Sequence, residues 1–214
     1  MKVELQSITP NAENNIVEIA RVSSSRKDKK AKPEGLINYL IKHKHFSPFE
    51  HSYVTLEIET SKAIGIQLIR HRSFTFQEFS QRYQDVNALD DIFEPIELRK
   101  QCEDNRQSST EVFDPVIKTY ATTNASEVIN SLLGNIKSTY MRLLEAGVAR
   151  EQARMILPMT TKTKIFMTGS IRSWIHFLNL RDDEHAQKEI QLVAKEVKEI
   201  FKQQLPIISN ALNY

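Results

Sequence analysis

The segment RHRSFTFQEFSQRY, residues 70–83, concentrates side chains that bind anions and flat rings. It places Arg70, Arg72 and Arg82 beside a single acid, Glu78. Guanidinium groups bind phosphate through a planar pair of donors, and neighbouring amide and hydroxyl groups can complete such a shell. The aromatic side chains of the same segment suit a flat heterocycle. The segment therefore indicates a binding site for a phosphorylated aromatic ligand.

A helix is expected to lead into this segment, over residues 61–72 with Ser61 as its N-cap. On that helix Gln67, Arg70 and His71 would share one face and extend the polar cluster. A simpler interpretation stays open. Cations are also favoured in the last turn of a helix by its dipole, and the phenylalanines could belong to the core.

The segment resembles the signature of the flavin-dependent thymidylate synthases, in which Arg-His-Arg is followed by seven residues and a serine. Here these residues are Arg70, His71 and Arg72, then Ser80, and Arg82 with Tyr83 completes the pattern. Other blocks are similar to those of the family over most of the chain. They are ARVSSS, HKHFSPFEH, GVAREQARMILP and FLNLRDDEHAQKEIQ, at 20–25, 43–51, 147–158 and 177–191.

Resemblance to this family implies an enzyme that makes dTMP from dUMP. It implies that 5,10-methylenetetrahydrofolate supplies the one-carbon unit and that NADPH supplies electrons through bound FAD. It also implies a homotetramer with active sites shared between subunits. No metal, nucleic acid or membrane is expected to take part, and the chemistry needs no cysteine nucleophile, so Cys102 is expected to be dispensable.

The resemblance further implies roles for individual residues. FAD would be bound by Ser47, Arg70, His71, Arg72, Glu78, Ser170, Arg172 and His176. The nucleotide dUMP would be bound by Gln67, Arg70, Glu78, Phe79, Ser80, Gln81, Arg82, Arg154 and Arg181. Arg181 would be the catalytic residue, because a guanidinium beside the uracil carbonyls stabilises a ring anion ionised at N3. Gln77 and Ser170 stand where the family often has asparagine.

Two other functions fit parts of the pattern. His43, His45, Glu50 and His51, with DDEH at 182–185, are plausible metal ligands, which would suit a metal-dependent nucleotide phosphohydrolase. Neither cluster has a tight ligand spacing such as HExxH. Arginines among aromatic residues would suit a module that binds single-stranded RNA. The net charge of +2 speaks against a general nucleic-acid binder, since such domains are usually strongly basic.

Composition predicts a folded protein in a reducing compartment. Of 214 residues 40% are apolar and 26% are charged, which is typical of a globular chain. No apolar run approaches the ~20 residues of a membrane-spanning helix. The start of the chain lacks the apolar core of a secretory signal, and Cys102 cannot form an internal disulfide. We therefore expect a cytoplasmic protein, in the host cytoplasm if it is viral.

The elements that must position these residues are expected to form one α+β domain over residues 1–214, with several helices on a modest, mainly antiparallel sheet. Strands are predicted at 2–8, 53–60 and 161–169, and a loop with short helical pieces at 84–110. Helices are predicted at 11–24, 29–43 (apolar face Leu36, Tyr39 and Leu40), 61–72, about 111–145, 149–157, 170–181 and 185–205. An interruption of the long helix at ATTNAS, residues 121–126, stays open. The last helix has an apolar stripe of Ile190, Val193, Val197, Phe201 and Leu205.

Overall fold

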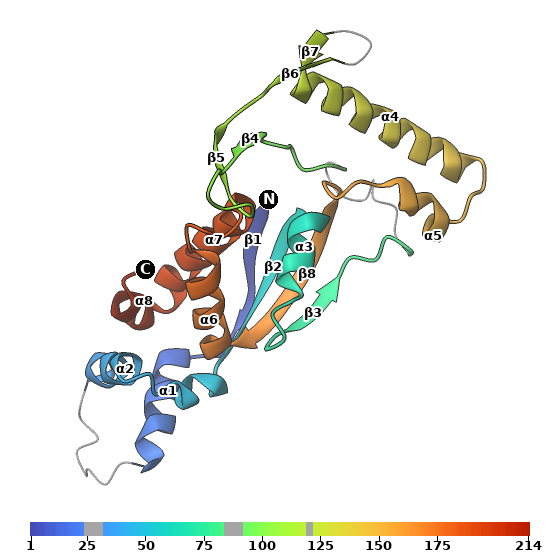
Figure 1. Ribbon diagram of the computed structural model, residues 1–214. Helices are drawn as coiled ribbons and strands as arrows, with labels where there is room; N and C mark the ends of the chain where they lie inside the picture. Colours follow the sequence, from blue (N-terminus) through green and yellow to red (C-terminus); the bar gives the residue numbers. More distant parts are fainter. Residues whose placement is uncertain (24–31, 84–91, 119–121) are drawn as a thin grey trace. The chain divides into compact units, whose positions relative to one another are not determined.

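The computed structural model describes residues 1–23, 32–83, 92–118 and 122–214 (Figure 1). These residues form two compact units, and β-strands run from one unit into the other. Unit 1 comprises Met1, 59–66 and 78–164, and unit 2 comprises 2–58, 67–77 and 165–214.

The main sheet has four strands in the order β1-β2-β8-β3, which are Lys2–Ile8, Tyr53–Ser61, Lys162–Ser170 and Thr75–Glu78. Neighbouring strands in this sheet run antiparallel. The Thr9 amide donates to the Tyr53 carbonyl at 3.0 Å, which joins the end of β1 to the start of β2. Alternation explains the strands: Val54, Leu56 and Ile58 are fully buried, and the residues between them are more exposed. The predicted strands and the α+β class are confirmed.

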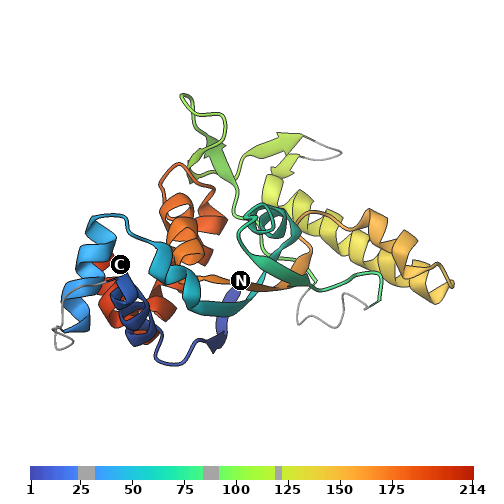
Figure 2. The same cartoon turned by 90° about the horizontal axis from the view of Figure 1, so that it is seen from below.

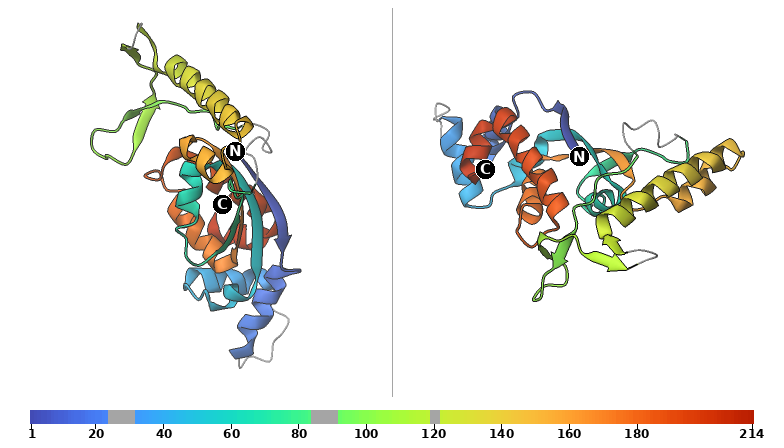
Figure 3. Two further views of the ribbon diagram at one scale, coloured as in Figure 1. Left: turned by 90° about the vertical axis from the view of Figure 1, so that its right-hand side faces the viewer. Right: turned by 90° about the horizontal axis from the view of Figure 1, so that it is seen from above.

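The helices of unit 2 lie against one face of the sheet or beyond its end (Figure 3). They are α1 (Ala12–Ala20), α2 (Pro33–Lys42), α6 (Ile171–Arg181), α7 (Lys188–Gln204) and α8 (Pro206–Leu212), with short 3-10 turns η1 (Arg21–Ser23) and η2 (Ser47–His51). Trp174 on α6 is fully buried and its indole Nε1 donates to the Val54 carbonyl at 3.1 Å. The predicted apolar stripe of α7 is buried throughout.

Unit 1 is built around the long helix α4 (Ala125–Glu145), with the short helix α5 (Arg150–Ala153) beside its C-terminal end (Figures 1 and 2). Gly147, with φ of 83°, turns the chain after α4, as expected for a residue that follows a helix. The remaining elements are α3 (Lys62–Leu68, which ends in unit 2), η4 (Arg154–Ile156), and the antiparallel pairs β4–β5 (Arg99–Gln101, Ser109–Val112) and β6–β7 (Val116–Lys118, Thr122–Asn124). Ile92, Tyr140 and Ala153 form its small core.

Several predicted elements are wrong in their bounds. The long helix begins at Ala125 and not near Glu111, because Pro115 cannot stand inside a helix and the β-branched residues around it form strands. Asp114 Oδ1 accepts the Ser126 amide at 2.9 Å and so supports the true N-terminus of α4. The predicted loop at 84–110 contains β4 and the start of β5, and its residues 84–91 lie outside the described part.

Two further corrections concern helix faces and ends. The buried face of α2 consists of Ile37 and Leu40, whereas Tyr39 is 51% exposed. Pro206 separates α8 from α7, and this short helix was not predicted. In the described part of the chain, no helix has the length and apolar character needed to cross a bilayer.

Candidate functional site

A pocket of about 570 Å³ in unit 2 brings together three of the residues predicted to bind FAD, namely Ser170, Arg172 and His176. Ser170 ends β8 and caps α6, and its Oγ accepts the Ser173 amide at 3.2 Å. Arg172 and His176 follow one turn apart on α6 and are exposed. The other lining residues are Phe46, Glu50, Tyr53, Ser73, Ser173, Ile175 and Asn179.

Glu50 organises this pocket, a role that the sequence did not predict. Its Oε1 accepts from Arg172 Nη1 at 2.6 Å, and its Oε2 accepts from Ser170 Oγ at 2.8 Å. The 3-10 turn η2 presents Glu50, and Pro48 at the start of that turn favours the required backbone. From its sequence context, Glu50 is a candidate only for a metal ligand. The signal that could have found it is its place in the HKHFSPFEH block.

His71 and Arg181 meet in unit 2, although they lie far apart in the sequence. Arg181 Nε donates to His71 Nε2 at 2.9 Å. Burial lowers the pKa of His71 to about 4, and the positive charges of Arg181 and His176 add to this effect. Burial also lowers the pKa of Arg181 from its ordinary value. The imidazole is therefore neutral at physiological pH.

The two arginines that flank His71 lie beyond the end of α3. This helix ends at Leu68, and the His71 amide donates to the Leu68 carbonyl at 3.0 Å in the turn that follows. The predicted helical face of Gln67, Arg70 and His71 is therefore wrong. Both Arg70 and Arg72 are exposed, and no acid among the described residues pairs with them.

The remaining predicted residues of unit 2 lie on turns or at helix ends. Gln67 Nε2 donates to Oε1 of Gln187, the residue before α7, at 2.6 Å. Ser47 begins η2 and is exposed.

The other predicted substrate residues belong to unit 1, where Glu78 is held from two sides. Its Oε1 accepts from Lys62 Nζ at 2.8 Å and from Thr163 Oγ1 at 2.8 Å. Thr163 is fully buried on β8 and Lys62 begins α3. Neither residue was predicted. Thr163 reaches Glu78 only because β8 pairs with β3, and Lys62 reaches it only because of where α3 begins.

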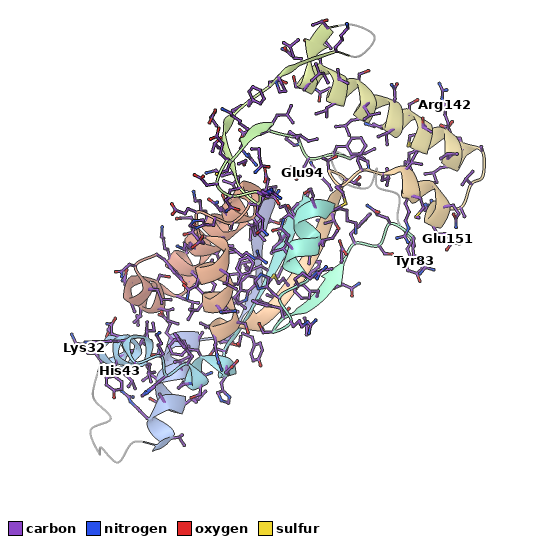
Figure 4. The ribbon with its side chains drawn as sticks, in the orientation of Figure 1. Lys32, His43, Tyr83, Glu94, Arg142 and Glu151 are labelled. Carbon is purple, nitrogen blue, oxygen red and sulfur yellow. The ribbon has the colours of Figure 1, made fainter. Side chains whose placement is uncertain are left out.

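Arg82 and Arg154 approach the same turn of α5. Arg82 Nη2 lies 3.6 Å from a Glu151 carboxylate oxygen, and Arg154 Nε donates to the Glu151 carbonyl at 3.4 Å. Figure 4 shows Glu151 and Tyr83 close to each other at this end of unit 1. The structure thus brings two arginines that were predicted to bind dUMP to the same residue, Glu151.

Between Glu78 and Arg82, some residues pack into the protein and others form a turn. Phe79 packs against the core of unit 1, and the Ser80 carbonyl accepts the Tyr83 amide at 3.1 Å. Gln81 is buried, and its Nε2 has no hydrogen-bond partner among the described residues. A buried amide without a partner is costly, so this donor suits a ligand.

The histidine-rich segment does not form a metal centre in the described part of the chain, where no group of three or more His, Cys, Asp or Glu side chains gathers. His43 instead stacks on Tyr39 with ring centroids 4.3 Å apart. In the DDEH segment, His185 Nδ1 and Asp183 Oδ1 form a local contact of 2.8 Å.

Comparisons with known proteins agree with the signature. The family described as thymidylate synthase complementing protein matches residues 4–207. A probable flavin-dependent thymidylate synthase of Paramecium bursaria Chlorella virus 1 is 41% identical over 204 residues, which cover 95% of this chain and 91% of that protein. A flavin-dependent thymidylate synthase of Synechocystis is 38% identical over 94% of this chain and 90% of that protein. One of Thermosipho melanesiensis is 39% identical over 89% of this chain and 81% of that protein. The chain therefore belongs to the thymidylate synthase complementing protein family, the family of these flavin-dependent thymidylate synthases.

Proposed function

We propose that this protein is a flavin-dependent thymidylate synthase, which makes dTMP from dUMP with bound FAD. The observation that carries the proposal is the match to the family over residues 4–207, with its Arg-His-Arg and Ser80 signature intact. The one-carbon donor is 5,10-methylenetetrahydrofolate and the reductant is NADPH. Both units serve one catalytic domain over residues 1–214, which acts in the cytoplasm.

The pocket of unit 2 has the chemistry that FAD needs. Its volume of about 570 Å³ lies in the range of cofactor pockets, and its lining combines aromatic and aliphatic side chains with several polar and charged groups. FAD, when bound, supplies the redox chemistry. Ser170, Arg172 and His176 would hold it, with Ser47, Arg70, His71, Arg72 and Glu78 contributing. Glu50 fixes the Arg172 side chain, and the unpaired Arg70 and Arg72 offer positive charge to phosphate groups.

The unit-1 residues suit the nucleotide. Arg82 and Arg154 lie at one turn and can share a phosphate, to which Ser80 adds a hydroxyl donor. Gln81 has a free buried donor, and Glu78 has one anchored oxygen and a second oxygen for the ligand. Phe79 supports these residues, and Gln67 and Arg70 complete the set.

Arg181 is the catalytic residue of the proposal. Its guanidinium would lie against the uracil ring and stabilise negative charge at N3, which makes C5 a better nucleophile toward the one-carbon donor. No thiol is required. Cys102 lies next to the β4–β5 hairpin of unit 1, and a Cys102→Ala protein is expected to keep most of its rate of dTMP formation.

We also propose that the protein is a homotetramer whose active sites draw residues from more than one subunit. Unit 1 exposes large apolar side chains that a partner would cover: Leu132 on α4 is 55% exposed, Met155 is 76% exposed and Met159 is 53% exposed. The predicted site residues also fall into two sets, one in each unit.

The visible spectrum of the purified protein tests the function. Flavin absorbance near ~450 nm is expected, and it should bleach when NADPH is added without oxygen, faster when dUMP is present. Formation of dTMP should then depend on all three small molecules. A colourless protein that FAD cannot reconstitute would contradict the proposal.

A further inference from the structure

We propose that His71 is a positioning residue: its neutral imidazole accepts the Nε–H of Arg181 and thereby fixes the guanidinium for contact with the uracil ring. The inference rests on the proposed function, because Arg181 acts on dUMP only in that function. It gives His71 a task that is separate from binding FAD.

The geometry of the contact defines the protonation state of His71. An arginine Nε always carries a hydrogen, since the guanidinium does not lose its proton in proteins. The atom 2.9 Å away, His71 Nε2, must therefore present its lone pair. A neutral imidazole has one donor and one acceptor nitrogen, so the ring proton of His71 resides on Nδ1.

The surroundings of His71 keep the imidazole neutral. The residue is 8% exposed, and its ring meets those of Phe177 and Phe74 in edge-on contacts, with centroids 5.0 and 6.2 Å apart. Arg181 and His176, both on α6, are the titratable groups that act on it, and each disfavours a second positive charge. No acid of the described chain contacts the ring to offset them. Burial and these neighbours hold the pKa of His71 at about 4.

The contact with His71 uses only the Nε atom of Arg181. An arginine side chain has many rotamers, and ordering it on substrate binding would cost affinity. With Nε tied to His71, the plane of the guanidinium is set before the ligand arrives. The donors on both Nη atoms have no partner among the described residues, and they remain available to the ring oxygens and N3 of uracil.

A matched pair of substitutions tests the proposal. In His71→Gln the amide oxygen falls near the place of Nε2, whereas in His71→Asn it falls near that of Nδ1. His71→Leu removes the acceptor and keeps an apolar side chain. FAD content and thermal midpoint are measured for each variant. The comparison of Gln with Asn tests the proposal even if the Leu variant does not fold.

The readout is the ionisation of bound 5-fluoro-dUMP at N3, followed by 19F NMR against pH in protein with and without FAD. Fluorine makes N3 ionise more readily, so the effect of Arg181 on the ring is measured without turnover. The wild-type protein should lower the N3 pKa of the bound ligand. His71→Gln should keep this effect, whereas His71→Asn and His71→Leu should lose about one pH unit of it, about tenfold in the ionisation constant.

In kcat/KM for dUMP, the Asn and Leu variants should fall on the order of tenfold below the Gln variant. In an Arg181→Ala background the His71 variants should no longer differ. Equal N3 pKa values for Gln and Asn would overturn the proposal. A wild-type protein that binds neither FAD nor 5-fluoro-dUMP would instead overturn the proposed function, and this inference with it.

Discussion

At the scale of single residues, the site depends on side chains that hold other side chains. Glu50 fixes Arg172, His71 fixes Arg181, and Lys62 with Thr163 fixes Glu78. In each case a charged group meets its partner across a long stretch of chain. Such pairs could not be predicted from spacing, because only the folded sheet and α6 bring the partners together.

Lys62 supports Glu78, which the proposal places against both dUMP and FAD. Lys62→Met removes one of the two donors on Glu78 Oε1 and lets the carboxylate rotate. We expect KM for dUMP to rise by about three- to tenfold, the cost of losing one charge-assisted hydrogen bond. Steady-state kinetics at saturating NADPH and folate check this.

Lys62→Arg is the control, since it keeps a cationic donor and should restore most of the affinity. Should the Met and Arg variants show the same KM as the wild-type protein, Glu78 either needs no support or does not bind the nucleotide.

His71 also predicts how stability depends on pH. The unfolded chain protonates this residue below its ordinary pKa of 6.5, whereas the folded protein does so only near pH 4. Between these values the unfolded state binds more protons, so the free energy of unfolding falls as the pH falls from 6.5 to about 4. Above 6.5 the contribution of His71 is complete, and below about 4 it is lost.

Urea unfolding of the wild-type and His71→Gln proteins at about pH 7 and about pH 5 measures this effect, because glutamine does not titrate and other groups cancel in the difference. The wild-type protein should lose more stability on acidification than the variant. Identical losses would mean that the folded His71 titrates normally.

At the scale of elements, the sequence predicted those segments whose pattern reflects one dominant force. β2 alternates because one face is buried, and the stripe of α7 repeats every three to four residues because one side of the helix meets the sheet. The start of α4 and the end of α3 were wrong. Pro115 and local strand pairing delay the start of α4, and a turn after Leu68 ends α3 early.

The residues of the candidate site also divide into those indicated by a sequence pattern and those whose role depends on tertiary contacts. Arg70, Arg72 and Ser80 became candidates because they belong to one continuous motif, and His176 because it stands in α6 next to a matching block. Glu50 as a pocket residue, Lys62 and Thr163 were not found, since their roles come from tertiary contacts. The role of each predicted residue remains part of the proposal.

Gly169 on β8 links the packing of an element to the site. A Cβ at this position would lie 2.4 and 2.5 Å from two ring atoms of Phe74. Phe74 cannot easily move, because its ring packs on Trp174 with centroids 4.8 Å apart and lies at the edge of His71. Gly169→Ala should therefore lower the free energy of unfolding by about 1–3 kcal/mol, as overpacking does.

Gly134 provides the matched control for this substitution. It lies within α4, and a Cβ there would meet nothing within 4 Å. Gly134→Ala should raise the free energy of unfolding by about 0.5–1 kcal/mol, because alanine favours a helix over glycine. Urea unfolding of both variants compares them directly. Equal stabilities of Gly169→Ala and the wild-type protein would show that the Phe74 ring can shift to make room for the added Cβ.

At the scale of the whole molecule, the distribution of the predicted residues bears on assembly. Arg181 and the pocket residues belong to unit 2, whereas Arg154 and the residues from Glu78 to Arg82 belong to unit 1. If active sites are shared between subunits, one site takes its unit-2 residues from one chain and its unit-1 residues from another. Arg181→Ala and Arg154→Ala would then inactivate opposite halves of each site.

Co-expression of these two inactive variants with different affinity tags tests this arrangement. In a random mixture about a quarter of the sites would combine an intact unit 2 with an intact unit 1, so about a quarter of the wild-type rate of dTMP formation should return. The mixed oligomer should have four times the chain mass of 24.8 kDa by light scattering. Mixed tetramers without activity would place both arginines of each site in the same chain, and a monomer would reject the proposed assembly altogether.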